Sequence, residues 1–84
     1  MTYQQLLQAL DINPDQRGEG EMIYPLPDLT RAGIRQRLGY PKEAELGAGG
    51  RMLLIYPIDC GRAMIVGYER DGVITRGMVY ISMS

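Results

Sequence analysis

The chain has 84 residues, 45% of which are hydrophobic, and its nine basic and ten acidic side chains leave a formal charge of −1 at pH 7. These values exclude a collagenous chain, a disordered chain and a globally basic nucleic-acid binder. The absence of histidine excludes a Ser-His-Asp triad and histidine metal ligands, and the single cysteine excludes an intrachain disulfide. We therefore expect one domain over residues 1–84, without catalytic residues, a metal site or a cofactor.

The sequence also bears on location. No stretch approaches the roughly 20 apolar residues of a membrane-spanning helix. Residues 1–5 carry neither the basic nor the apolar part of a secretory signal peptide. A single unpaired cysteine suits a reducing compartment, so we expect a cytoplasmic protein.

Two short helices are expected. Thr2 is suited to an N-cap, and apolar residues recur at helical spacing after it, which predicts a helix over residues 2–10. A second helix is predicted over residues 30–38, because Thr30 provides an N-cap and Gly39 stands where a C-terminal glycine belongs.

Strands are expected in the second half of the chain. The dipeptide Asp71-Gly72 between two apolar segments is the strongest short-range signal for a hairpin with a type I′ turn. The segments 15–21 and 41–50 are polar or glycine-rich and are expected to be loops. Strands are predicted over residues 52–56, 62–70 and 73–81. The short run 22–24 is either a fourth, edge strand or a covering segment. The sequence thus predicts an α+β fold with two short helices packed on one face of a three-stranded, or with this run four-stranded, antiparallel meander.

A two-residue turn fixes the register of the last two strands. It places Tyr68 opposite Thr75, Val66 opposite Gly77 and Met64 opposite Val79. We expect this face, which also carries Ile81, to pack against the helices. The other face is then left uncovered, with an apolar patch around an arginine, and such patches commonly mark contact sites. The predicted partner-binding residues are Ile65, Ile74, Arg76, Met78 and Tyr80.

The second predicted helix carries three arginines, Arg31, Arg35 and Arg37. The first two are four residues apart and share a helix face. A helix of this kind before a β-hairpin is similar to the recognition helix of a winged helix-turn-helix protein, in which arginines contact phosphates or bases. The alternative interpretation is a solvated polar face opposite Ile34 and Leu38.

Other chemical motifs lack the context that they need. The glycine-rich segment 47–50 precedes a predicted strand, whereas phosphate-binding glycines open a helix. Cys60 has no histidine to serve as its base. Neither feature predicts catalysis.

The second helix and the strand region carry residues that recur together in a known family: Leu29-Thr30-Arg31, Ile34, Leu38-Gly39-Tyr40-Pro41, Tyr56, Tyr68 and Asp71-Gly72-Val73. Through these residues the chain resembles, from residue 26 to residue 81, the small outer-membrane-assembly lipoproteins of the SmpA/OmlA type. The resemblance implies a non-enzymatic domain that binds proteins through its sheet or loops. The chain differs from the family in having Leu29 where a glycine is usual, and in lacking a signal peptide and a lipid-attachment cysteine near its start.

Taken together, these features predict a small protein-binding module, either an accessory subunit or an inhibitor of a larger protein. Its small, histidine-free format also suits a phage or mobile-element product. A homodimer through the uncovered sheet face is an open alternative. The second functional hypothesis is a winged-helix-like DNA-binding protein that uses Arg31, Arg35 and Arg37.

Overall fold

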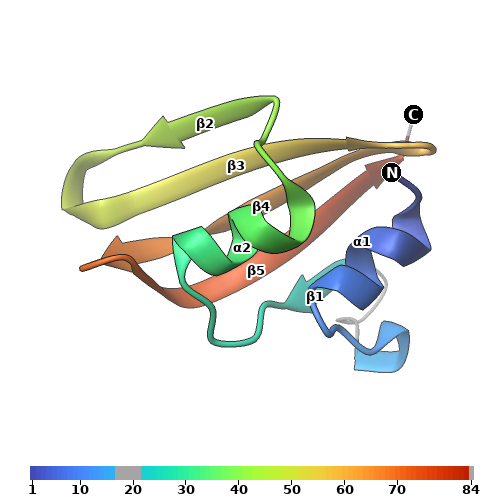
Figure 1. Ribbon diagram of the computed structural model, residues 1–84, viewed down its shortest axis with the longest axis horizontal. Helices are drawn as coiled ribbons and strands as arrows, with labels where there is room; N and C mark the ends of the chain where they lie inside the picture. Colours follow the sequence, from blue (N-terminus) through green and yellow to red (C-terminus); the bar gives the residue numbers. More distant parts are fainter. Residues whose placement is uncertain (17–21, 84) are drawn as a thin grey trace.

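Five antiparallel strands form a single sheet in the order β1–β5–β4–β3–β2, and two helices lie on one side of it (Figure 1). The computed structural model describes residues 1–16 and 22–83, so the loop predicted over residues 15–21 lies, from residue 17 on, outside the described residues. The predicted α+β class with an antiparallel sheet is confirmed, but the sheet has five strands rather than three or four. The strands are β1 (Ile23–Pro25), β2 (Glu43–Leu46), β3 (Arg51–Ile58), β4 (Gly61–Arg70) and β5 (Val73–Met83).

The strand β2 lies in a segment that was predicted to be a loop. Its four residues are all exposed, so its side chains give no pattern of burial. It is held as a strand by pairing with β3, in which Glu43 is opposite Ile55 and Leu46 is opposite Met52. The loop prediction is wrong here because this edge strand is specified by its partner strand rather than by its own apolar residues.

Both helices begin where their capping residues predict. The helix α1 (Tyr3–Ala9) starts after Thr2, whose hydroxyl accepts a hydrogen bond from the Gln5 N–H. The helix α2 (Arg31–Leu38) starts after Thr30, whose hydroxyl accepts from the Gly33 N–H at 2.9 Å. Two short 3-10 helices, η1 (Pro14–Gln16) and η2 (Ala48–Gly50), complete the regular structure of the described residues. None of the helices in the described residues is long and apolar enough to span a membrane.

The β4–β5 hairpin contains a bulge that changes which residues share a face. The turn at Asp71 and Gly72 has positive φ at both positions, as a type I′ turn requires, and the predicted pairing of Tyr68 with Thr75 is observed. The ladder then shifts by one residue, so that Val66 is opposite Met78. The extra residue is on β5, where Arg76 has a φ of 53°.

This shift overturns the predicted pairs beyond the bulge. Val66 is not opposite Gly77, and Val79 is opposite Ile65 instead of Met64. Glycine suits position 77, since a Cβ there would lie 2.7 Å from a side-chain carbon of Leu26.

The bulge also decides which sheet face forms the core. Paired residues in an antiparallel ladder lie on the same face. The shift therefore places Ile74, which precedes the bulge, and Val79 and Ile81, which follow it, on the face that carries Ile65. That face packs against the helices, and the prediction that the Met64 and Val66 face would do so is wrong. The core side chains are Ala63, Ile65, Ile74, Val79 and Ile81 from β4 and β5, Met52, Leu54, Tyr56 and Ile58 from β3, and Leu6, Leu7 and Ile34 from the helices, together with Leu10, Ile12, Tyr24 and Leu26.

The two edges of the sheet differ. Beyond β1, the segment that leads into α2 continues along β5: the Leu26 N–H donates to the Gly77 carbonyl, and the Ile74 N–H donates to the Leu29 carbonyl. At the opposite edge of the sheet, β2 is the last strand.

Candidate functional site

The sheet face opposite the helices carries two rows of apolar side chains, which we call the apolar block. Both helices lie on the other side of the sheet (Figure 1). Ile55 illustrates the separation, because it is buried and yet is not part of the core cluster beneath the helices. The first row is Ile23, Tyr80, Met64 and Ile55, and the second row is Pro25, Met78, Val66 and Leu53. We refer to this side of the sheet as the open face.

Charged side chains border the apolar block. On β2, Glu43 is opposite Ile55 and Glu45 is opposite Leu53, so both glutamates flank the rows on one side. Arginines lie at both ends of the apolar block. Arg62 is opposite Pro57 at one end. At the other end are Arg51, which is opposite Tyr68, Arg70, which is opposite Val73, and Arg76 at the bulge.

The open face is hollowed near the bulge. A depression of about 570 Å³ lies between side chains of β3, β4 and β5, with Glu45 on its rim. Two aromatic rings border it and remain accessible, since Tyr68 is 43% exposed and Tyr80 is 36% exposed. The depression is also lined by Arg51, Leu53, Val66, Arg76 and Met78.

The five residues predicted to bind a partner are divided between the two sides of the sheet. Arg76 and Tyr80 are exposed and Met78 is half-buried, and all three line the depression on the open face. Ile65 and Ile74 are 0% and 2% exposed and belong to the core, so the prediction that they form a contact surface is wrong. The physical reason is the bulge. An uninterrupted ladder puts Ile65 and Ile74 on the same face as Met78 and Tyr80, whereas the bulge moves Met78 and Tyr80 to the opposite face.

Sequence reasoning missed most of the apolar block. It placed Met64 and Val66 in the core, and it did not consider Ile23, Leu53 or Ile55 as surface residues. One signal was present in the sequence, because an isolated glycine inside a strand pattern, here Gly77, indicates a bulge. A bulge placed there moves Met78 and Tyr80 onto the same face as Met64 and Val66.

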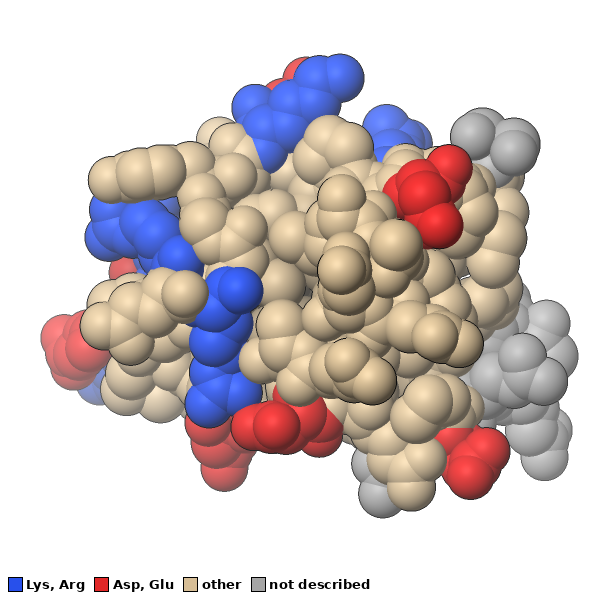
Figure 2. All heavy atoms as spheres, turned by 45° about the vertical axis from the view of Figure 1, so that its right-hand side comes forward, with Lys and Arg blue, Asp and Glu red and all other residues tan. Residues whose placement is uncertain are grey.

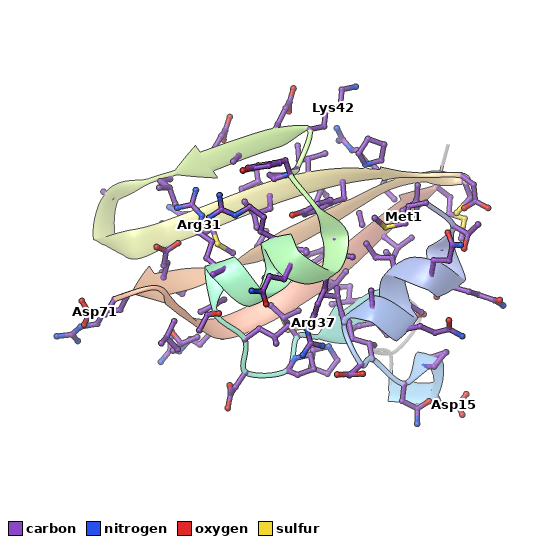
Figure 3. The ribbon with its side chains drawn as sticks, in the orientation of Figure 1. Met1, Asp15, Arg31, Arg37, Lys42 and Asp71 are labelled. Carbon is purple, nitrogen blue, oxygen red and sulfur yellow. The ribbon has the colours of Figure 1, made fainter. Side chains whose placement is uncertain are left out.

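The three arginines of α2 do not form one row. Arg31 points toward the β2–β3 side of the helix, whereas Arg37 points to the side nearer α1 (Figure 3). Arg37 donates hydrogen bonds to the Asp11 carboxylate at 2.8 Å and to the Ala9 carbonyl at 3.1 Å. It therefore ties α2 to the end of α1, while Arg31 and Arg35 border a separate hollow.

The surroundings of α2 also differ from those of a winged-helix recognition helix. In the described residues, β1 rather than a helix precedes α2. On the side of the molecule seen in Figure 2, basic and acidic side chains are interspersed and do not form a continuous basic surface.

The remaining motifs occupy turns. The glycine-rich segment forms the β2–β3 connection around η2 and leads into a strand, as the sequence predicts. Cys60 lies half-buried in the β3–β4 turn. Within residues 1–16 and 22–83, no group of three or more cysteine, aspartate or glutamate side chains is placed to hold a metal ion.

Comparison with known proteins gives no match: no family model, curated protein or solved structure is similar to this chain. The resemblance to the SmpA/OmlA-type lipoproteins stays a prediction.

Proposed function

We propose that the chain is a non-catalytic protein-binding module, and that its open face binds a folded partner with an apolar patch bordered by acidic side chains. The observation that carries this proposal is the apolar block, eight side chains in two adjacent rows on the sheet face that the helices leave uncovered. A contiguous apolar surface of this kind is uncommon on a monomeric protein unless it serves an interface.

The composition of the open face supports a protein partner. Tyrosine, methionine and arginine are enriched at the centres of protein interfaces, and here Tyr80, Met78 and Arg76 lie together beside a hollow. A partner side chain inserted into this hollow would contact the apolar side chains of Leu53, Val66 and Met78, with arginines beside it. Side chains that fill such pockets near the centre of an interface contribute most to affinity.

The charges favour a different protein over a second copy of the chain. Four arginines and two glutamates border the apolar block, so the open face is positive although the whole chain carries −1. Two such faces brought together would repel each other, whereas acidic groups on a partner would pair with the arginines. An accessory subunit or an inhibitor of a larger protein fits this mode of binding.

The experiment compares capture by two matched double variants. Tyr80→Ala with Arg76→Asn removes two exposed side chains from the open face, and asparagine tolerates the positive φ of position 76. Gln36→Ala with Arg37→Asn removes two exposed side chains from α2 on the helix side. Each tagged protein is incubated with nuclease-treated lysate of the native host, and the recovered protein is purified and titrated by calorimetry.

We expect the open-face variant to weaken the purified complex at least about 30-fold, since hot-spot residues each contribute about 2 kcal/mol or more. The α2 variant should bind as the unaltered chain does, and both should keep its circular dichroism spectrum. Equal binding by the open-face variant would contradict the proposal. So would recovery of nucleic acid alone, or light scattering that shows a dimer dissociated by the open-face substitutions.

A further inference from the structure

A second hollow lies on the helix side of the sheet, between α2 and the β2–β3 hairpin. It has a volume of about 290 Å³ and is separate from the open face. Arg31 and Arg35 border it from α2, and the rings of Tyr40 and Tyr56 form walls. Ala44 and Leu54, which are opposite each other on β2 and β3, give it an apolar floor.

The two arginines differ in how far their charge is compensated. Arg31 is 3.4 Å from the Glu69 carboxylate and shares its charge with that group. Arg35 forms no ion pair with a carboxylate of the described residues, and its guanidinium lies 5.2 Å from the centre of the Tyr40 ring. The hollow therefore has one positive charge without a carboxylate partner, held over an aromatic ring.

Tyr56 shows that both guanidinium groups act on the same space. Its hydroxyl donates a hydrogen bond to the Gly39 carbonyl at 2.9 Å, which fixes the ring against the end of α2. Burial raises the pKa of this hydroxyl above its usual value of 10.0, and Arg35 and Arg31 oppose the increase. The positive potential of both arginines thus reaches the wall of the hollow.

We infer that this hollow binds the carboxylate of a ligand whose apolar part rests on Ala44 and Leu54. A carboxylate is planar and matches the donor fork of the Arg35 guanidinium. A carboxylate carries one negative charge, which balances the one positive charge of Arg35. A phosphate monoester carries nearly two negative charges. The hollow is close to the lower limit of about 300 Å³ for ligand pockets, so it suits a small group.

A carboxylate on an apolar body has two sources, a free organic acid and the C-terminus of a polypeptide that ends in an apolar residue. Both present the same chemistry to Arg35. The test therefore uses 3-phenylpropionate as the organic acid and the peptide N-acetyl-Gly-Gly-Leu with a free C-terminus. The amide of each compound and inorganic phosphate serve as ligand controls.

Binding is followed by ¹⁵N–¹H nuclear magnetic resonance on the full chain. We expect both acids to shift the backbone signals of Arg35 and Ala44, and both amides to bind at least about tenfold more weakly, because hydrogen bonds between charged groups are the strong ones. Arg35→Gln should reduce the affinity for the acids by a similar factor. Arg37→Gln, which removes an arginine of the same helix that lies outside the hollow, should leave the affinity unchanged.

The relative affinities identify the source. Tighter binding of the peptide acid assigns the hollow to a polypeptide C-terminus, and equal or tighter binding of 3-phenylpropionate assigns it to an organic acid. The inference is overturned if neither acid shifts Arg35 and Ala44, if the amides bind as well as the acids, if phosphate binds more tightly than both acids, or if Arg35→Gln binds the acids unchanged.

Discussion

The bulge in β5 can be tested by alanine substitutions on its two sides. With the bulge, Ile65 and Val79 are opposite each other and both lie in the core, at 0% exposure. An uninterrupted ladder from the same turn would pair Ile65 with Met78 and would place Val79 on the other face. The two registers therefore predict different members of the core at positions 78 and 79.

The magnitudes follow from burial. Ile65→Ala removes three buried carbons, which gives about 2.4 kcal/mol at about 0.8 kcal/mol per carbon, and the cavity raises the loss toward the observed range of about 2 to 5 kcal/mol. Val79→Ala removes two buried carbons and should cost about 1.5 to 3 kcal/mol. Val66→Ala and Met78→Ala truncate half-buried side chains on the open face. Each should cost less than about 1.5 kcal/mol, since the loss scales with the apolar area buried.

These differences are measurable by urea unfolding followed by circular dichroism. An 84-residue chain is expected to unfold with a free energy of about 4 to 13 kcal/mol, so Ile65→Ala alone removes a large part of the stability. The reasoning would be refuted if Met78→Ala lowered the free energy of unfolding more than Val79→Ala while Ile65→Ala remained costly. That result would restore the uninterrupted ladder.

Three further predictions concern caps, glycines and pH. Thr30→Ala should lower the stability by about 0.5 to 2 kcal/mol in thermal unfolding, because it removes the hydroxyl that caps α2, and Thr30→Ser should restore most of it. Gly61→Ala should cost more than about 3 kcal/mol, since a Cβ there would overlap the Ser82 carbonyl, whereas Gly72→Ala meets no atom within 4 Å and should cost only the strain of its positive φ, about 1 to 2 kcal/mol; similar losses in urea unfolding would contradict this. Burial raises the pKa of the Tyr56 hydroxyl when the chain folds. The contribution of this hydroxyl to the free energy of unfolding is therefore fully present below about pH 10 and is lost as the pH rises through the folded-state pKa. Urea unfolding at pH 8 and pH 11 should therefore show a smaller alkaline loss for Tyr56→Phe than for the unaltered chain, and equal losses would argue against it.

Features coded by neighbouring residues could be predicted from the sequence. The start of α2 depends on the Thr30 hydroxyl and its end on Gly39, which has a φ of 80°. The β4–β5 turn depends on Asp71 and Gly72, whose positive φ values need these residue types. Each of these signals acts over four residues or fewer, so the tertiary structure does not override it.

Features that depend on distant partners were missed. The strand β2 has no apolar alternation and exists because its backbone pairs with β3, which the residues from Glu43 to Leu46 do not reveal. The position of a bulge depends on how the whole ladder packs, and one shifted residue exchanges the faces of everything beyond it. For the candidate site, Arg76, Met78 and Tyr80 were predicted on an exposed surface, whereas Ile65 and Ile74 were misplaced by this exchange.

The unequal edges of the sheet limit how copies of the chain can join by strand pairing. The β1 edge is short, includes a proline and is continued by the segment that leads into α2, so it offers few backbone groups to another strand. Among the strands of residues 1–16 and 22–83, β2 is the one with an open edge, and a second copy could pair there with its own β2. Such a contact uses the same edge on both copies and is therefore closed after two chains. A continuous fibril would need a second open edge, and the two glutamates of β2, Glu43 and Glu45, further oppose fibril growth by charge repulsion.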